Sequence, residues 1–312
     1  MTATGLAPRQ VTVDGTTRKA GRKRTAGASW LGRGMVLPAL LLTGVLVGYP
    51  LVRGIMMSLQ AGGVATGTPA HYVGMRNYRD VFTDPGTKTA AIHTLFYLLI
   101  AVSLEIVGGL IVAVTLQRAF RGRGLVLAIL ILPWALPSVV SGVLWRRILD
   151  PDSGLLNRAL MSLHVIDTPH IWLASDRLGI FFISLVHVWG LIPLVSLVLL
   201  AGLQSIPEEL YDASAVDGAS AIRQFRHITL PLLRPALVIA LTVGTLAAMS
   251  IFDEVYVLNG TALNTRSLLM QVYDTTFNQA DFSHGIALAM MVAVASATLA
   301  IIFGLLLRRV TR

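Results

Sequence analysis

Six long apolar segments constrain the fold of this 312-residue chain more than any other feature. Each holds roughly 20 residues or more, which lets a helix cross the hydrocarbon core of a bilayer, about 30 Å thick. Only 13% of the residues are charged, whereas soluble domains have about 25%. We therefore predict an all-α integral membrane protein with six transmembrane helices within residues 31–312. The predicted helices cover residues 35–57, 90–116, 125–144, 178–203, 236–258 and 285–307.

Basic residues predict how the chain is oriented in the membrane. Residues 1–30 lack an apolar period and are rich in Gly, Thr, Lys and Arg, so we predict a disordered cytoplasmic tail there. The basic run from Arg18 to Arg24 could bind nucleic acid, but the positive-inside rule explains it more simply. With the N-terminus inside, 16 of the 25 Lys and Arg residues fall in the tail, the two inner loops and the C-terminus. Both termini are therefore predicted to be cytoplasmic, with no nucleic-acid partner.

The loop over residues 205–231 is polar, although it connects two apolar segments. Ser205 and Glu208 have the spacing of a capping box, which predicts a helix that begins just after Ser205. Gly218 is the type of residue that ends a helix in a left-handed conformation. Ser220 can then cap a second short helix, which Leu230-Pro231 would close. Two such helices form a knob that another protein can grip. The alternative is an amphipathic helix on the membrane surface, but the loop has few large apolar or basic residues.

This loop resembles the cytoplasmic coupling loop of binding-protein-dependent ABC permeases. That family carries Glu-Ala-Ala, three residues, Gly, nine residues, Ile, one residue and Leu-Pro. Every spacing is matched here, by Asp212-Ala213-Ser214, Gly218, Ile228 and Leu230-Pro231. Asp and Ser replace the family's Glu and second Ala with similar charge or size. The resemblance implies that the first helix fits a groove on an ATPase subunit. The residues assigned to ATPase coupling are Glu208, Glu209, Tyr211, Asp212, Ala213, Ser214, Asp217, Gly218, Ile228 and Pro231.

Three other segments resemble the maltose-type branch of this family, which imports sugars. They are Leu132–Pro137, Trp189–Pro193 and Ile251–Gly260, although the branch often has Gly-Gly-Pro where this chain has Gly260-Thr261-Ala262. The resemblance implies a type I ABC importer permease fold and transport by alternating access. The implied partners are a second homologous permease, two ATPase subunits that bind ATP and Mg²⁺, an extracytoplasmic solute-binding protein and a carbohydrate. The implied location is the lipid of a bacterial cytoplasmic membrane.

No catalytic motif stands out in the sequence. A phosphate-binding loop of the form G-x-x-x-x-G-K-[ST] is missing, Cys is absent, and the seven His residues lack metal-ligand spacing. We therefore expect a permease subunit, not an enzyme, with no metal or cofactor of its own. Side chains suited to sugar rings and hydroxyls are Trp134, Ser138, Ser141, Trp189, Ser196, Thr245, Met249, Ser250, Asp253 and Tyr256. Ser and Thr also commonly pack membrane helices, and Trp often lies at membrane interfaces.

Acids near or within the apolar segments keep other functions open. Glu105, Asp253 and Glu254 could serve a secondary carrier or channel that acts without an ATPase, but such a carrier does not explain the polar loop. A non-transporting structural subunit is a third alternative. We interpret Glu105 as hydrogen-bonded within the bundle and His187 as a hydrogen-bonded packing residue. The outer loops, residues 58–88 and 146–177, would hold short helices or turns that dock an external partner or only connect the segments.

Overall fold

The structure, a computed structural model, describes residues 36–63 and 67–310. The predicted tail over residues 1–30 lies outside the described residues. The chain divides into two compact units, Met1–Val52 and Arg53–Arg312, and each is considered by itself.

The described part of the first unit is helical. It belongs to the helical run Val36–Ser58, which is 23 residues long and apolar enough to cross a membrane, as predicted. The run contains the π-helical turn η1 (Gly44–Gly48) and continues as helix α2 (Tyr49–Ser58), which ends in the second unit.

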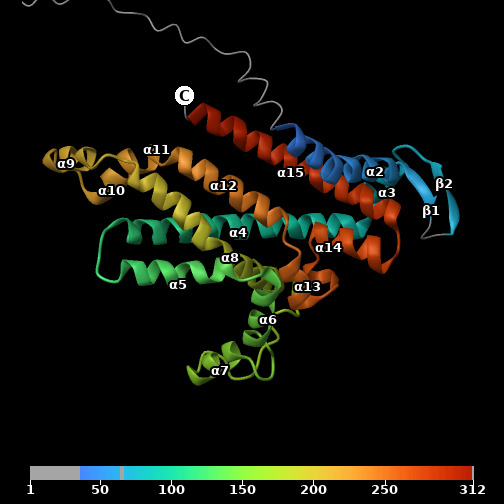
Figure 1. Ribbon diagram of the computed structural model, residues 1–312. Helices are drawn as coiled ribbons and strands as arrows, with labels where there is room; N and C mark the ends of the chain where they lie inside the picture. Colours follow the sequence, from blue (N-terminus) through green and yellow to red (C-terminus); the bar gives the residue numbers. More distant parts are fainter. Residues whose placement is uncertain (1–35, 64–66, 311–312) are drawn as a thin grey trace, which may run out of the picture. The chain divides into compact units, whose positions relative to one another are not determined.

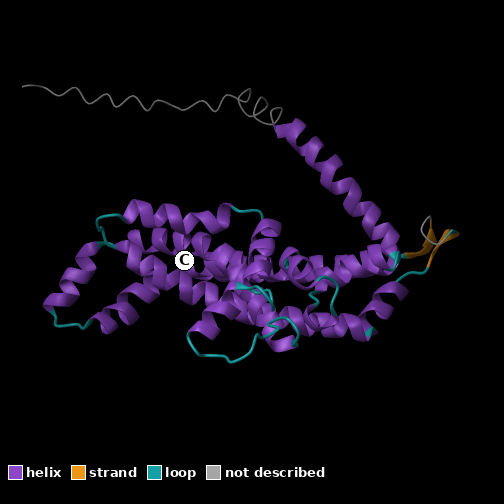
Figure 2. Cartoon of the chain, turned by 90° about the horizontal axis from the view of Figure 1, so that it is seen from below, coloured by secondary structure: helices purple, strands orange, loops and turns teal. Residues whose placement is uncertain are grey.

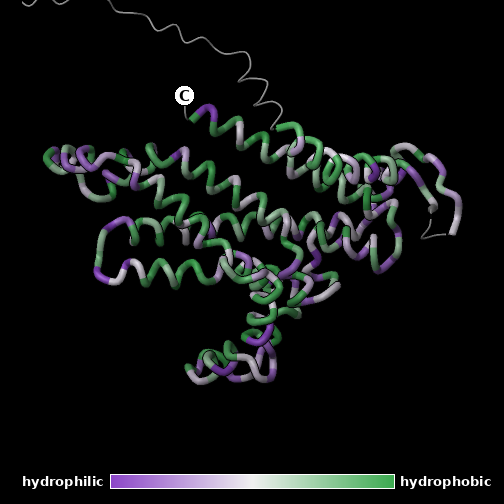
Figure 3. Tube along the Cα trace, in the orientation of Figure 1, coloured by the Kyte–Doolittle hydropathy of each residue, from purple (hydrophilic) through white to green (hydrophobic). Residues whose placement is uncertain are grey.

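Three long helices of the second unit lie where spans two, four and six were predicted. They are α4 (Pro85–Gln117), α8 (Asp176–Gln204) and α15 (Phe282–Val310), and they are predominantly apolar, as Figure 3 shows. Two of their starts are capped by side chains that satisfy backbone N–H groups of the first turn. Asp84 accepts from the N–H of Thr87 at 2.6 Å, and Ser175 accepts from that of Leu178 at 3.4 Å.

Predicted spans three and five are bent. The third consists of α5 (Arg123–Ala135) and α6 (Ser138–Ile148), which meet at 99°. Pro137 explains the break, because proline has no N–H group and disfavours a helical conformation in the preceding residue. The fifth has α12 (Arg234–Met249) preceded by Ala221–Leu232 at an angle of 68°. Among the described residues, four helices are long and apolar enough to cross a membrane, and the number rises to six if each bent pair is counted as one span. In the second pair, Ala221–Leu232 belongs to the polar loop and not to the predicted fifth span.

The fifth predicted span is wrong in its second half. Helix α12 ends at Met249, and residues 253–259 form a separate short helix, α13 (Asp253–Asn259). Apolar residues continue through this stretch, so hydropathy alone extended the span to residue 258. The acidic first turn of α13, Asp253 and Glu254, marks a new helix N-terminus, where negative charge is favourable.

The core of the second unit lies between α4, α8 and α12, which pack against one another (Figures 1 and 2). Small residues allow the close approach of these helices. A Cβ atom at Gly109 of α4 would lie 2.7 Å from Val195 of α8, and one at Gly202 would lie 2.4 Å from the Ala236 side chain of α12. Fully buried side chains such as Tyr97, Leu199 and Met270 fill the remaining space.

The two predicted outer loops contain short helices, α3 (Arg76–Thr83) and α7 (Leu155–Ser162). Three further short elements lie between α13 and α15 and were not predicted: the 3₁₀ turn η3 (Leu263–Thr265), α14 (Leu268–Tyr273) and the π-helical turn η4 (Asp274–Asn278). The prediction of an all-α protein misses one antiparallel hairpin, β1 (Gln60–Gly63) and β2 (Thr68–Tyr72), drawn in orange in Figure 2. Asn77 of α3 holds the start of this hairpin by donating to the carbonyls of Ser58 and Gln60, both at 2.8 Å.

Candidate functional site

The polar loop folds into a helical hairpin at the end of the second unit that lies away from the β1–β2 hairpin (Figure 1). Its first arm is α9 (Glu208–Val216), and its second arm is formed by α10 (Ala221–Gln224), the π-helical turn η2 (Phe225–Thr229) and α11 (Leu230–Leu232). Gly218 joins the arms with φ +76°, a left-handed conformation that glycine adopts without steric cost. We call residues 208–232 the loop hairpin.

Side-chain hydrogen bonds fasten the two arms of the loop hairpin together. The hydroxyls of Tyr211 and Thr229 lie 3.0 Å apart. The amide of Gln224 donates to the Ser214 hydroxyl at 2.9 Å, and that hydroxyl donates to the carbonyl of Tyr211 at 2.8 Å. Ser214, which stands where the family motif has its second Ala, therefore stabilises the hairpin internally.

The first arm of the loop hairpin exposes mainly acidic and small residues, and the hairpin also exposes Val216, Ile222, Arg223 and Arg226. Glu208, Glu209, Asp212 and Asp217 are exposed, together with Ala213 and Gly218, whereas Tyr211, Ser214, Ile228 and Pro231 are partly buried. Beneath it, a hollow of about 750 Å³ is lined by the end of α4, the end of α8 and both hairpin arms. The exposed acids provide negative charge to a partner protein, and the small side chains beside them allow that protein to approach the hairpin backbone closely.

Two local predictions for this loop are wrong. Ser205 does not cap α9; its hydroxyl donates back to the carbonyl of Gly202 at 2.7 Å, and Pro207 occupies the N-cap position. Leu230-Pro231 does not end the second arm either. The π-helical turn η2 precedes Pro231, and the helix continues to Leu232. By contrast, Ser220 caps α10 by accepting from the N–H of Arg223, as predicted.

Four of the predicted sugar contacts lie on α6 and α13, two helices that pack against each other, and one of the four, Ser141, is buried. Ser138 donates a hydrogen bond to the carboxylate of Asp253. Ser141 lies on α6 and Tyr256 on α13, and a Cβ atom at Gly142 would lie 3.0 Å from Val257 of α13. Hydroxyl, carboxylate and aromatic groups are therefore concentrated at this helix junction.

The other predicted sugar contacts do not join this group. Ser196 is buried and donates to the carbonyl of Ile192 in its own helix, and Thr245 and Met249 are also buried. Ser250 donates to the carbonyl of Leu246. Trp189 packs edge-on against Trp145 with ring centroids 5.8 Å apart, while Trp134 is 51% exposed on α5. These side chains serve helix packing or face outward elsewhere.

A buried cluster of two acids and one histidine connects α4, α8 and α13. The Nδ1 atom of His187 lies 2.8 Å from the Glu254 carboxylate, and its Nε2 atom lies 3.6 Å from the Glu105 carboxylate. Among the described residues, neither oxygen of Glu105 has a hydrogen-bond partner. The interpretation of Glu105 as hydrogen-bonded is therefore wrong, whereas that of His187 is confirmed. Gly244 makes room for this cluster, since a Cβ atom there would lie 2.4 Å from a Glu105 oxygen.

Comparison with known proteins identifies the family. Residues 105–312 match the family described as binding-protein-dependent transport system inner membrane component. The chain belongs to this family. It is thus the multi-pass inner-membrane permease subunit of an ABC transporter, and not the subunit that hydrolyses ATP. The predictions of family, fold and non-enzymatic role are confirmed.

Several permeases named as parts of transport systems resemble this one. It is 35% identical over 278 residues to the trehalose/maltose transport system permease protein MalF of Thermococcus litoralis, covering 88% of this chain and 92% of that protein. It is 35% identical over 269 residues to the trehalose transport system permease protein SugA of Mycobacterium tuberculosis, covering 86% of each. A sulfoquinovosyl glycerol transport system permease protein, SmoG of Agrobacterium fabrum, is 32% identical over 259 residues, covering 82% of this chain and 83% of that protein.

A solved structure confirms the fold. A chain from a bacterial ABC transporter involved in alginate import superposes with a TM-score of 0.77 over 92% of this permease and 98% of that chain. At 20% sequence identity, this likeness concerns the arrangement of the helices.

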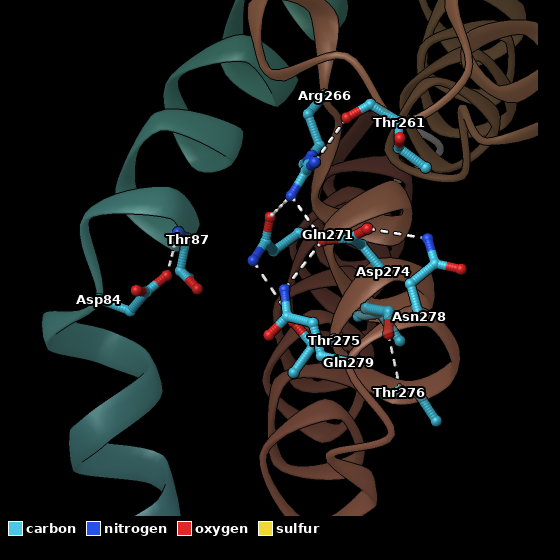
Figure 4. A network of polar contacts seen from close by, with 11 residues as sticks. Asp84, Thr87, Thr261, Arg266, Gln271, Asp274, Thr275, Thr276, Asn278 and Gln279 are labelled. Atoms are coloured by element: carbon cyan, nitrogen blue, oxygen red, sulfur yellow. Dashed lines mark hydrogen bonds and ion pairs between the residues drawn. The ribbon is translucent and has the colours of Figure 1, made fainter.

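The permease also contains a polar network that we did not predict (Figure 4). The guanidinium of Arg266 donates to the carboxylate of Asp274 at 2.8 Å, to Gln271 at 2.9 Å and to the carbonyl of Thr261 at 2.5 Å. Asp274 also accepts from Asn278 and Gln279, both at 2.9 Å. The network fixes η3, α14 and η4 to one another beside a polar hollow of about 430 Å³. Residues 261–279 gave no motif from which it could be found.

The network predicts how stability responds to acid. Burial raises the pKa of Asp274, but hydrogen bonds from Asn278 and Gln279 and the charge of Arg266 outweigh it, so the net pKa lies below its usual value. Such a group stabilises the folded state above its unfolded pKa, about 3.9, and this contribution is lost as pH falls through the lower folded pKa. We expect the melting temperature of Asp274→Asn in detergent to be lower at pH 7 and less sensitive to acid than that of wild type.

The exposed Asp167 provides the matched control for this pH series. Asp167→Asn should melt as the wild type does at every pH between 7 and 3. An Asp274→Asn variant whose melting temperature follows the wild-type pH curve would show that the Arg266 network does not stabilise the ionised carboxylate.

Proposed function

We propose that this permease forms half of the translocation pore of an ATP-driven carbohydrate importer. A second homologous permease would complete the pore, two ATPase subunits would bind ATP and Mg²⁺, and an extracytoplasmic solute-binding protein would deliver the substrate. The observation that carries the proposal is the exposed loop hairpin, in which the motif residues from Asp212 to Pro231 form a compact helical knob between long apolar helices. A self-sufficient carrier has no need of such an element.

The loop hairpin would transmit ATPase movement to the pore. Its outward residues, Glu208, Glu209 and Asp212 among them, would contact the ATPase, and Gly218 would allow close approach of the ATPase backbone. The hydrogen bonds from Tyr211 and Ser214 to the second arm make the hairpin stiff. Because that arm runs directly into α12, a displacement of the hairpin would tilt α12 and the α13 helix that follows it.

We infer that the loop hairpin and both termini lie on the cytoplasmic side. The excess of Lys and Arg in the tail, the two inner loops and the C-terminal end supports this orientation. Arg308 and Arg309 in the last turn of α15 belong to that set. The junction of α6 and α13, with Ser138 and Asp253, would then face the extracytoplasmic half of the pore.

The substrate class is proposed from the relatives. Two of them are named for trehalose or maltose, and a third for a sulfonated glycoside of glycerol. All three names refer to small glycosides, neutral or acidic and of about disaccharide size, and we propose this class as the substrate. The aromatic, hydroxyl and carboxylate groups at the α6–α13 junction suit such a ligand, because sugars offer apolar ring faces and many hydroxyls.

Reconstitution tests the proposed function. The permease would be co-expressed with the second permease and the ATPase subunits, and the complete transporter would be placed in liposomes. These liposomes should accumulate radiolabelled trehalose or maltose only when ATP and the binding protein are present. The permease alone in the same liposomes should transport neither sugar. Solute movement by the permease alone without ATP would establish a secondary carrier instead, and the complete complex moving no glycoside would refute the substrate class.

A further inference from the structure

We propose that five aromatic side chains form a carbohydrate-binding track that extends from the α6–α13 junction toward the start of α15. The track comprises Phe252, Tyr256, Tyr273, Phe277 and Phe282, and the inference rests on the proposed function. Tyr256 alone was among the predicted sugar contacts. Tyr273 and Phe277 lie outside the candidate membrane spans, and Phe282 is the first residue of the span Phe282–Val310.

The rings of the track follow one another without a gap. Centroids are 5.8 Å apart from Phe252 to Tyr256, 5.5 Å from Tyr256 to Tyr273, 5.3 Å from Tyr273 to Phe277 and 6.2 Å from Phe277 to Phe282. These are the distances at which aromatic rings attract each other. The five residues come from the start of α13, α14, η4 and the start of α15, so the tertiary fold assembles the series.

Three of the five rings in the track are exposed. Phe277 is 63% exposed, Tyr256 46% and Phe282 37%, and the other two rings are partly buried. Aromatic rings in mutual contact usually occur in a core, where they are covered. Here they are anchored to one another and still present ring surface outward, as a site for a stacked ligand requires.

Polar groups along the track favour a sugar over lipid as its occupant. Asn278 and Gln279 are exposed next to Phe277, and Asp253 follows Phe252. A surface that faces lipid acyl chains does not carry such groups without cost, whereas a sugar needs both an apolar surface for its ring and hydrogen-bonding groups for its hydroxyls. The inner end of the track also meets the Ser138–Asp253 hydrogen bond, so it continues a predicted sugar site.

The elements behind the track hold it in place. The Arg266 network fixes η4, which carries Phe277, through Asp274 (Figure 4). Gly285 lets α15 approach η4 closely, because a Cβ atom there would lie 2.0 Å from the Thr276 hydroxyl and 3.0 Å from its Cα atom. A rigid row of rings binds a ligand with less loss of conformational entropy than a flexible one.

Substitution of Phe277 tests the track, because its exposure makes misfolding of the variant easy to avoid. In liposomes that contain the complete transporter, Phe277→Ala should raise the KM for trehalose or maltose uptake about three- to tenfold, with little change in maximal rate. Phe277→Tyr, which keeps the ring, should restore the wild-type KM. Tyr72→Ala serves as control, since Tyr72 is 75% exposed and lies on β2 outside the track.

Four outcomes would decide between these readings. A raised KM in Phe277→Ala, with unchanged affinity of the complex for the loaded binding protein, supports the track. Weaker docking of the binding protein to Phe277→Ala would make the aromatic row a protein contact and overturn the inference, as would a wild-type KM. If wild type itself transports no sugar, the proposed function fails, and that result is distinct because it appears before any substitution is made.

Discussion

Replacing Gly218 with Asp is expected to abolish uptake while leaving the permease folded and inserted in the membrane. Gly218 has φ +76° and no atom within 4 Å of a Cβ position, so an aspartate side chain fits and points away from the hairpin. The left-handed conformation would cost only about 1 kcal/mol, and Asp tolerates it better than most residues. The loss of uptake should therefore result from a weakened contact with the ATPase, because the charged side chain on the hairpin surface would hold the ATPase away from α9.

Gly218→Asn is the matched control for this variant. Asn has nearly the shape of Asp and the same tolerance of positive φ, but it adds no charge to a surface that already carries Glu208, Glu209, Asp212 and Asp217. We expect Gly218→Asp to lose more uptake than Gly218→Asn, and affinity purification in mild detergent should recover the second permease with both. The ATPase should be depleted only with Gly218→Asp. Normal uptake by Gly218→Asp would refute the coupling role of the loop hairpin.

Local sequence patterns predicted the parts of this molecule that depend on neighbouring residues. Gly218 and Ser220 adopt the predicted turn and cap because a positive φ and an N-cap bond need only a few adjacent residues. Ser205 was mispredicted for a related reason. A capping box and the C-terminal turn of a preceding helix can share the same residues, and α8 extends to Gln204, so the Ser205 hydroxyl bonds back to α8.

Hydropathy predicted where the long apolar helices lie but not their bends or all their ends. The break at Pro137 and the stop at Met249 both occur inside apolar stretches, where a hydropathy average does not change. Contacts between residues far apart in the sequence were even harder to predict. Nothing local places Arg266 beside Asp274 and Gln271, or aligns Phe252 with Phe282, because the tertiary fold creates these neighbours.

The buried acid and histidine cluster should dominate the stability of the permease. In His187→Leu, the Glu254 carboxylate would lose its hydrogen-bond partner at 2.8 Å, and Glu105 would lose the imidazole nitrogen that lies 3.6 Å away. Removing one partner of a buried ion pair typically costs about 3–5 kcal/mol, because the remaining charge stays desolvated. We expect a large fall in the melting temperature of the purified permease and in the amount of folded protein in membranes.

The same reasoning predicts which second substitution rescues the first. In His187→Leu/Glu254→Gln, the uncompensated carboxylate is replaced by a neutral amide of similar shape, so much of the lost stability should return. His71→Leu, which alters an exposed histidine on β2, should change the free energy of unfolding by less than about 0.5 kcal/mol. If the double variant is no more stable than His187→Leu, the cost lies in lost packing of the imidazole between α4, α8 and α13. In that case His187 would stabilise the permease through side-chain packing, and the two carboxylates would not need it as an electrostatic partner.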